Sequence, residues 1–248
     1  MTEPSTPVLS VRGEARRTVS PDSVFLPGAL TVTAASKPEA LREAAAALEG
    51  LTADLRSLGG APLTPDTERD PLTWSAYSAA THEEGKHDPR TGEYGPTGQV
   101  TATVAIITTV RDFAVLDPLS ELLAGHERLA IHHTGWNVDP DNPAWRQVRT
   151  AAIHSAIRKG RDYAAALGGS LLQVLHIADV GLLGGEGSGG GARHMSGSGW
   201  FPQAAMATAG GPQPGAPSLD PVPQELVATI EARFTTTGIS LVESLVDG

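Results

Sequence analysis

The sequence predicts an α+β fold in which long helices pack on a largely antiparallel sheet. Two long apolar helical patterns, each closed by a Gly-Gly pair, lie between runs typical of β-strands. The order strand, helix, strand, strand occurs twice, over about residues 8–125 and residues 126–237. We therefore expect two similar halves, with a flexible tail at residues 1–7 before them and an apolar tail at residues 238–248 after them.

The first half begins with β-rich runs and continues with the clearest helical pattern of the chain. Ser36 and Glu39 have the spacing of a capping box, so we expect a helix that starts after Ser36 and ends at Gly59-Gly60. Two strands are then expected over residues 72–81 and 98–109, joined by a long polar loop. The apolar stripe of the helix comprises Leu41, Ala44, Leu48, Leu51, Leu55 and Leu58.

A short helix over residues 112–124 closes the first half, and a strand over residues 128–137 opens the second. Asn142 as N-cap and Pro143 as first helical residue predict a second long helix, which runs to Leu167. The remaining strands are expected over residues 170–180 and 225–236.

The segment between these last two strands differs in composition from the rest of the chain. Residues 181–217 hold 12 glycines and 4 prolines, which predicts a long flexible loop before the last strand. Its isolated large apolar residues Trp200, Phe201 and Met206 would become ordered only against an apolar surface. We therefore take these three as candidate interaction residues.

The C-terminal residues supply a second set of candidates. Ser240 and Glu243 have capping-box spacing, which favours a short amphipathic helix that is stable only when docked. The docking groove belongs either to the chain's own domain or a sister subunit, or to a separate protein, in the manner of the peptides that load cargo into encapsulin shells. The apolar residues of this set are Ile239, Leu241, Val242, Leu245 and Val246.

The overall composition argues against several classes of function. Basic residues number 18 and acidic residues 28, and the resulting formal net charge of −10 disfavours nucleic acid as a partner. The chain has no cysteine, which excludes disulfides, thiolate metal sites and a cysteine nucleophile. Because neither a signal peptide nor an apolar run long enough for a membrane span is visible, we expect a cytoplasmic protein without a membrane span.

The second long helix differs in charge from the rest of the chain. It carries five basic residues against the single acid Asp162, a local net charge of +4 (5 − 1). One interpretation is a solvated face paired with acidic neighbours, and the other is a charge-complementary contact with an acidic surface of a sister subunit. The basic residues are Arg146, Arg149, Arg158, Lys159 and Arg161.

No coherent catalytic set can be assembled from the sequence. The G-x-G-x-x-G match at residues 185–190 leads into more glycine rather than into a helix, and no G-x-S-x-G elbow occurs. The run Asp139–Asn142 is interpreted as a helix entry rather than as a cation site. The polar loop over residues 82–97 holds side chains with the chemistry of metal ligands, although polar loops collect such residues by composition. These candidate ligands are His82, Glu83, Glu84, His87 and Asp88.

Several segments together resemble one known family. Val11-Arg12-Gly13-Glu14, followed by Ser20-Pro21-Asp22, is similar to the opening strand pair of the SIMPL domain family, also called DUF541. Ala15 stands where that family often has a second glycine. The Ala-rich helix that ends in LRSLGG, the stretch ALGGSLLQVLHIAD and the end PSLDPVPQELVATIEARF resemble later parts of the family, so that the resemblance extends from Val8 to Phe234.

The resemblance implies that the protein has no established catalytic activity and no cofactor. It also implies an association with stress tolerance and signalling partners, and some bacterial members form large ring-like homo-oligomers. We therefore predict a non-enzymatic, stress-related protein that acts as a homo-oligomeric assembly or scaffold. The alternative is a small-molecule or metal-binding module that uses residues 82–88, and an uncharacterised hydrolase ranks third.

Overall fold

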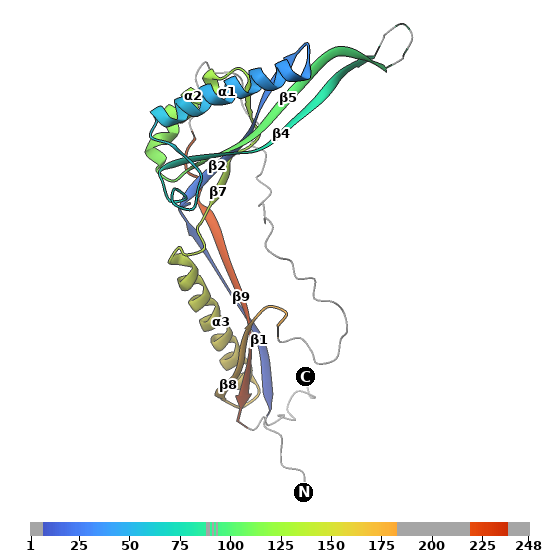
Figure 1. Ribbon diagram of the computed structural model, residues 1–248. Coiled ribbons are helices and arrows are strands. Elements are labelled where there is room, and N and C mark those ends of the chain that lie inside the picture. The colour runs from blue at the N-terminus through green and yellow to red at the C-terminus, as the bar shows by residue number, and fades with distance from the viewer. Residues whose placement is uncertain (1–6, 88–89, 91, 93, 183–218, 238–248) are drawn as a thin grey trace. The chain divides into compact units, whose positions relative to one another are not determined.

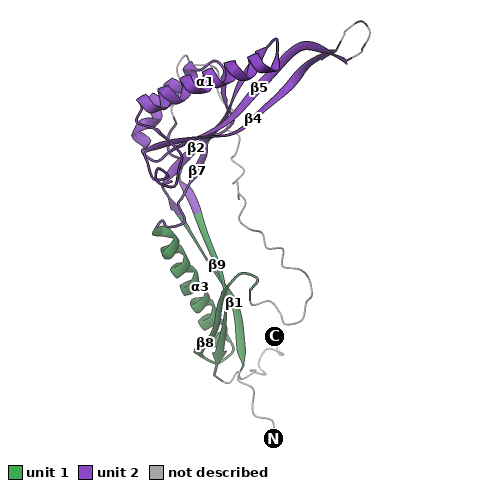
Figure 2. Cartoon of the chain, viewed as in Figure 1, with its two compact units in different colours: residues 1–17, 143–214, 226–248 green, residues 18–142, 215–225 purple. Residues whose placement is uncertain are grey.

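A computed structural model describes residues 7–87, 90, 92, 94–182 and 219–237, which form two compact units (Figures 1 and 2). Unit 1 comprises residues 1–17, 143–214 and 226–248, and unit 2 comprises residues 18–142 and 215–225. Each unit joins segments that are distant in the sequence, so neither coincides with a continuous half of the chain. The predicted α+β class is confirmed, because each unit contains a long helix and a sheet.

Unit 2 is built on a six-stranded sheet in the order β3-β4-β5-β2-β6, with β7 also paired to β2. The central strand β2 is antiparallel to β5 on one side and to β6 and β7 on the other. β4 is antiparallel to β5, and the short β3 is parallel to β4. The strands of this sheet are β2 (Ser23–Ala34), β3 (Ala61–Pro62), β4 (Leu72–His87), β5 (Tyr94–Val110), β6 (Leu129–Ile131) and β7 (Gly135–Asn137).

The strand expected over residues 128–137 is divided into β6 and β7. β6 pairs with β2 as far as Gly28, and β7 resumes the pairing at Phe25. Between them lies Pro27, which accepts a hydrogen bond of 2.8 Å from the His132 N–H but has no N–H to donate in return. The missing donor accounts for the break in the ladder.

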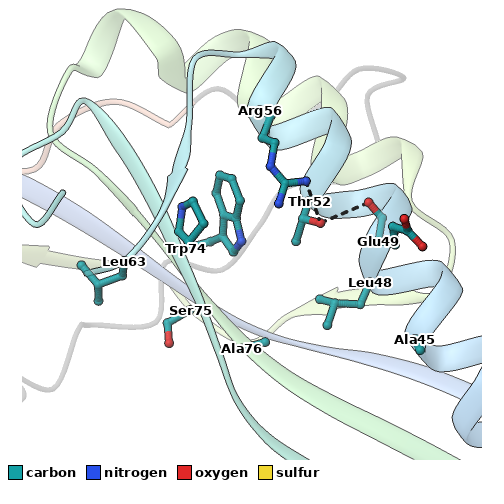
Figure 3. A pocket seen from close by; sticks show the side chains of 10 residues that line it. Ala45, Leu48, Glu49, Thr52, Arg56, Leu63, Trp74, Ser75 and Ala76 are labelled. Carbon is teal, nitrogen blue, oxygen red and sulfur yellow. Dashed lines mark hydrogen bonds between the residues drawn. The ribbon is translucent and has the colours of Figure 1, made fainter. Parts of the chain in front are cut away.

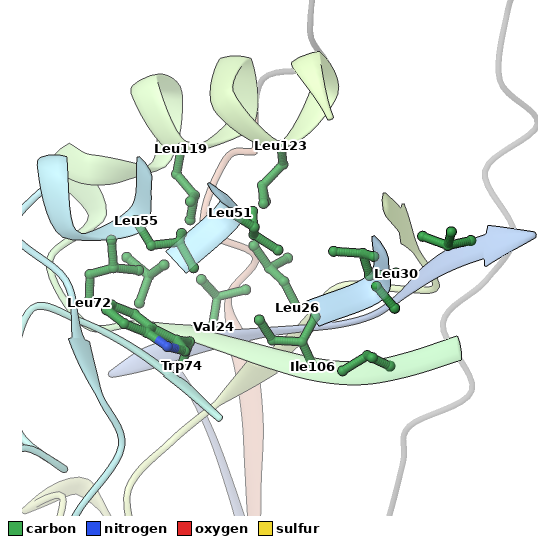
Figure 4. Packing of buried hydrophobic residues seen from close by; sticks show 14 of the residues in the cluster. Val24, Leu26, Leu30, Leu51, Leu55, Leu72, Trp74, Ile106, Leu119 and Leu123 are labelled. Carbon is green, nitrogen blue, oxygen red and sulfur yellow. The ribbon is translucent and has the colours of Figure 1, made fainter. Parts of the chain in front are cut away.

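Helices cover one face of this sheet (Figure 4). α1 (Lys37–Ser57) ends at Leu58, and Gly59 adopts the left-handed conformation (φ 81°) that the Gly-Gly signal predicts. Ser36 is the N-cap, but its side chain makes no capping hydrogen bond, so the predicted capping box is not formed. Pro38 follows in the first turn and removes one of the backbone donors that such a cap uses.

The core of unit 2 lies between these helices and the sheet. The short helix predicted over residues 112–124 is a 3-10 turn, η1 (Phe113–Val115), followed by α2 (Leu116–Gly125). Figure 4 shows side chains of α1 and α2 directed at the strands below them. The largest fully buried apolar side chains of this core are Val24, Leu26, Leu30, Leu51, Leu55, Leu72, Ile106, Val110 and Leu119.

Residues 82–87 and 94–97 lie in strands and not in the polar loop that the sequence predicts over residues 82–97. β4 continues to His87 and β5 begins at Tyr94, so the two strands remain paired past Ala34, where β2 ends. We call the outer part of this hairpin, residues 75–87 of β4 and residues 94–100 of β5, the arm. Residues 75–83 pair with residues 100–107 inside the sheet, and only residues 84–87 with residues 94–99 form a two-stranded ribbon. Figure 1 shows it extending past the end of α1. Strand pairing is compatible with this polar sequence because neither face of the ribbon has to be apolar.

Unit 1 consists of a three-stranded sheet and one long helix. The strand order is β1-β9-β8, formed by β1 (Val8–Val19), β9 (Gln224–Thr236) and β8 (Leu171–Asp179), with β8 antiparallel to β9. The helix is α3 (Ala144–Ala166), and Gly168 after it has φ 72°. The buried apolar residues of unit 1 are mostly small: Val11, Ala144, Val148, Ala152, Ala156, Ala164, Leu226, Ala228, Ile230, Ala232 and Phe234.

The start of α3 differs by one residue from the prediction. Pro143 is the N-cap and Ala144 the first helical residue. The side-chain amide of Asn142, directly before them, donates to both carboxylate oxygens of Asp22, over 2.9 Å and 2.8 Å.

Candidate interaction surfaces

A buried carboxylate organises one corner of unit 2. Asp139 is 8% exposed, and its Oδ2 accepts a hydrogen bond of 2.7 Å from Arg111 Nη1. Its backbone N–H donates to Asp22 Oδ2 over 2.8 Å, and the amide of Asn142 donates to that same Asp22 carboxylate. The polar groups of the run Asp139–Asn142 are therefore used for internal hydrogen bonds that hold this segment beside the turn before β2.

An exposed ion pair extends this cluster to the surface. Arg69 Nη2 donates to Asp141 Oδ2 over 2.8 Å. This hydrogen bond lowers the pKa of Asp141 below its ordinary value of 3.8 and raises the pKa of Arg69 above its ordinary value. Both groups lie at the surface, so the pair is exposed to screening by salt.

The residues predicted to form a metal-binding loop lie instead on the arm. Glu84 Oε1 accepts a hydrogen bond of 2.6 Å from Thr101 Oγ1 and lies 3.2 Å from His82 Nε2. Thr101 Oγ1 also lies 2.7 Å from Thr33 Oγ1 of β2. Glu83, exposed between His82 and Glu84, makes none of these contacts. The network ties the arm to the sheet.

The other candidate ligands do not join this network. The His87 ring packs on Tyr94 with a centroid separation of 5.2 Å, and Asp88 is outside the described residues. Within the described part of the chain, no group of three or more histidine, aspartate or glutamate side chains is arranged to hold a metal ion.

Much of the arm has an uncovered strand edge. β2 covers the outer edge of β5 only as far as Val100, and β3 covers the outer edge of β4 only at Thr73 and Trp74. Within the described residues, the rest of the arm has strand pairing on one side alone. Most of its side chains are exposed, including every residue from Ala76 to Ala80. The outer edge of β4 is therefore open to another strand.

A groove lies beside this open edge, between α1 and the start of β4 (Figure 3). Its volume is about 510 Å³. The guanidinium of Arg56 lies 5.4 Å from the centroid of the Trp74 ring and donates a long hydrogen bond, 3.5 Å, to Thr52 Oγ1. Leu48 and Leu63 add aliphatic surface, as Figure 3 shows. This lining has the chemistry of a groove that accepts an apolar side chain.

Unit 1 exposes an apolar strip on its edge strand β8. We define the apolar strip as Leu172, Val174, Leu175 and Ile177, which are 58%, 47%, 37% and 45% exposed. Val174 lies opposite Phe234, and Ile177 lies opposite Ala232. Both partners are buried, and Phe234 packs near Gly160 of α3. The side chains of Val174 and Ile177 therefore lie on the same face of the sheet as α3, but the helix does not bury them.

The helix beside this strip is basic. Arg146, Arg149, Arg158, Lys159 and Arg161 are all exposed, as both interpretations of the sequence require. Lys159 Nζ donates to the backbone oxygen of Arg12 over 2.9 Å, and Arg149 stacks over Trp145. No ion pair joins any of these five side chains to an acidic residue in the described part of the chain. The ion pairs expected from the first interpretation are thus not found among those residues.

The interaction residues predicted from the sequence lie outside the described residues: Trp200, Phe201, Met206, Ile239, Leu241, Val242, Leu245 and Val246. The apolar strip and the open edge of β4 over residues 75–81 were not among the predicted interaction residues. The run LLQVLHIA around the strip has the uniform apolar character of a buried strand, so its sequence alone does not indicate an exposed edge.

No helix in the described ranges combines the length and the apolar character needed to cross a membrane. Among curated proteins, none matches the chain. The family model described as "SIMPL: Protein of unknown function (DUF541)" matches residues 9–234.

Proposed function

The chain belongs to the SIMPL family, and on that premise we propose that it acts as a non-enzymatic, homo-oligomeric assembly or scaffold protein. The family is described as one of unknown function, so the description assigns no activity. The observation that carries the proposal is the arm, because its open edge is of the kind that another chain covers.

The outer edge of β4 is open to another chain. Within the described residues, β4 pairs only with β5 from Ser75 onward, so this edge presents backbone N–H and C=O groups that a further strand can pair with. A strand of a second copy, paired to the outer edge of β4, would supply backbone hydrogen bonds along residues 75–81. Apart from Tyr77 the side chains there are small, and none is charged, so another backbone can approach closely.

Finer expectations belong to the same proposal. They are a stress-related role, a cytoplasmic location and a protein partner that binds residues 238–248, with an encapsulin-type shell as one such partner. These expectations rest on the sequence and on the family resemblance, whereas the homo-oligomer also rests on the arm.

Size-exclusion chromatography with light scattering tests the proposal. At micromolar concentration the mass should be a multiple of the 25.6 kDa of one chain. The double variant Ala79→Lys/Ala80→Lys places two charges on the open edge of β4 and should shift the mass to a smaller species.

The matched control is Ala124→Lys, which adds a charge at an exposed alanine of α2 and should leave the mass unchanged. A wild-type mass of 25.6 kDa would overturn the proposal of a homo-oligomer. A double variant with the full wild-type mass would show that the arm is not the interface.

A further inference from the structure

We propose that residues 238–248 dock on the apolar strip of unit 1 in their own chain. The proposal goes beyond the proposed function, because it assigns a binding surface to the C-terminal residues and does not require a second copy. Three independent observations carry it: the exposure of the strip, the place where the chain leaves β9, and the charge of α3.

The strip is an unusual concentration of exposed apolar side chains. Of the fourteen large apolar residues that are exposed in the described part of the chain, six lie between Leu172 and Leu182. Apolar residues scattered singly over a surface need no explanation, whereas a row of them on an edge strand promotes aggregation. Leu172 and Leu175 are each the extra residue of a β-bulge, so bulges alone do not remove them from solvent.

The described part of the chain ends at Thr237, beside the start of this strip. Thr236 of β9 lies opposite Leu171, the first residue of β8. Thr237 continues the contact, because its N–H donates to Ser170 O over 2.9 Å and its Oγ1 accepts from Ser170 N over 2.7 Å. Residue 238 therefore starts at the end of β8 from which the strip runs.

The distance to be covered is short. From Leu172 to Ile177 a strand spans about 17 Å at roughly 3.3 Å per residue. Eleven residues cover about 16 Å as a helix and about twice that when extended, so either conformation reaches along the strip. Docking requires the chain to reverse direction after Thr237, and the next residue in the sequence is Gly238, the residue type best suited to a tight turn.

The chemistry of the two partners is complementary. The segment 238–248 combines five apolar residues with two acidic ones, Glu243 and Asp247, and has no basic residue. Gly160 of α3 packs over Leu171, and Arg158 and Arg161 flank it with exposed guanidinium groups. An acidic amphipathic segment on the strip would cover the apolar row and place its carboxylates near these two arginines.

Residues 238–248 of the same chain are favoured as the occupant of the apolar strip, because a short covalent connection tethers them beside it. A short connection holds a segment near its site at a millimolar effective concentration, which a separate molecule at micromolar concentration does not match. The same segment from a second copy, or capture of the segment by another protein, would compete with this contact.

Disulfide trapping tests the contact cleanly, because the chain has no cysteine of its own. The variant Ile177→Cys/Leu245→Cys should form an intramolecular disulfide under mild oxidation. The matched control Leu41→Cys/Leu245→Cys uses a leucine of similar exposure on α1 of unit 2. The yield of the strip pair should exceed that of the control by about tenfold, as its higher effective concentration implies. If the first variant does not fold, Leu172→Cys replaces Ile177→Cys.

Charge reversal adds a second readout. Arg158→Glu/Arg161→Glu in the trapped variant should lower the yield, and Glu243→Arg/Asp247→Arg in addition should restore it. A disulfide-linked dimer on a non-reducing denaturing gel, or equal yields for the strip pair and the control, would overturn the proposal. The denaturing gel distinguishes a disulfide within one chain from a disulfide between chains in any oligomeric state. Its outcome is therefore independent of the light-scattering test of the proposed function.

Discussion

Gly13 of β1 lies directly under Ala156 of α3: a Cβ built on Gly13 would be 2.8 Å from the Ala156 Cβ and 2.7 Å from its backbone nitrogen. Such a Cβ would also collide with the carbonyl oxygen of Ala152. Helix and strand approach this closely because the buried line of α3 consists mainly of alanine and Gly160. The contact between the two elements in unit 1 therefore depends on small residues on both sides.

Gly13→Ala should destabilise unit 1, because the helix backbone has to move to admit one methyl group. Overpacking of this kind costs about 1–3 kcal/mol. Urea unfolding followed by circular dichroism measures the change. Gly50→Ala is the matched control: position 50 lies in α1, and a methyl group there would meet nothing within 4 Å, so alanine should stabilise the protein by roughly 0.5–1 kcal/mol. Equal effects at both positions would contradict the close approach.

Asp139→Asn should destabilise unit 2, because Arg111 loses the carboxylate that it contacts in a partly buried site. The expected cost is roughly 1–3 kcal/mol, the range for a buried polar group that loses its partner. Thermal unfolding of the variant measures it. Glu121→Gln serves as control, since Glu121 is exposed on α2 and forms no ion pair with a described residue; its melting temperature should match that of the wild type.

The Arg69–Asp141 pair should make stability depend on pH in the acid range. Because the pKa of Asp141 is lowered in the folded state, its carboxylate stabilises the fold above the ordinary pKa of 3.8. That contribution is lost as the pH falls through the lower, folded value. Asp141→Asn should therefore be less stable than the wild type at neutral pH, and the difference should disappear in acid. A difference that is the same at every pH in urea titrations would rule out this role.

Glu84→Ala should loosen the arm without unfolding unit 2. The substitution removes the carboxylate that accepts from Thr101 and faces His82, and a hydrogen bond of this kind contributes about 0.5–1.5 kcal/mol. Amide hydrogen exchange in residues 82–100 should become faster. Glu83→Ala removes a neighbouring charge that makes no such contact and should leave the exchange rates unchanged; faster exchange in that variant too would argue for a general charge effect.

The elements of the fold that local signals specify were predictable from the sequence. Both long helices end where a Gly-Gly pair follows, and Gly59 and Gly168 adopt the positive φ that only a few residues tolerate. The length of the arm was not predictable, since polar residues from His82 onward are compatible with either a loop or a ribbon exposed on both faces. Pairing between β4 and β5 decides between them.

The candidate surfaces depend on which strands lie at the edges, and local sequence does not encode this. Val174 and Ile177 have the residue types of a buried strand and are exposed only because β8 has β9 on one side and no described strand on the other. Local sequence likewise does not indicate that β1 pairs with β9, a pairing that brings together the first and the last strand of the chain. Hydrophobic periodicity identifies the strands but not their order in the sheet.

That pairing of β1 with β9 determines the order in which the protein can mature on the ribosome. β1 is synthesised first, but its partner follows about 205 residues later, which takes roughly 10–40 s at typical translation rates. The strands and helices of unit 2 from β2 to β7 are complete well before then. The nascent β1 must therefore stay soluble while unpaired, and its charged residues Arg12, Glu14, Arg16 and Arg17 oppose its association with other chains during that interval.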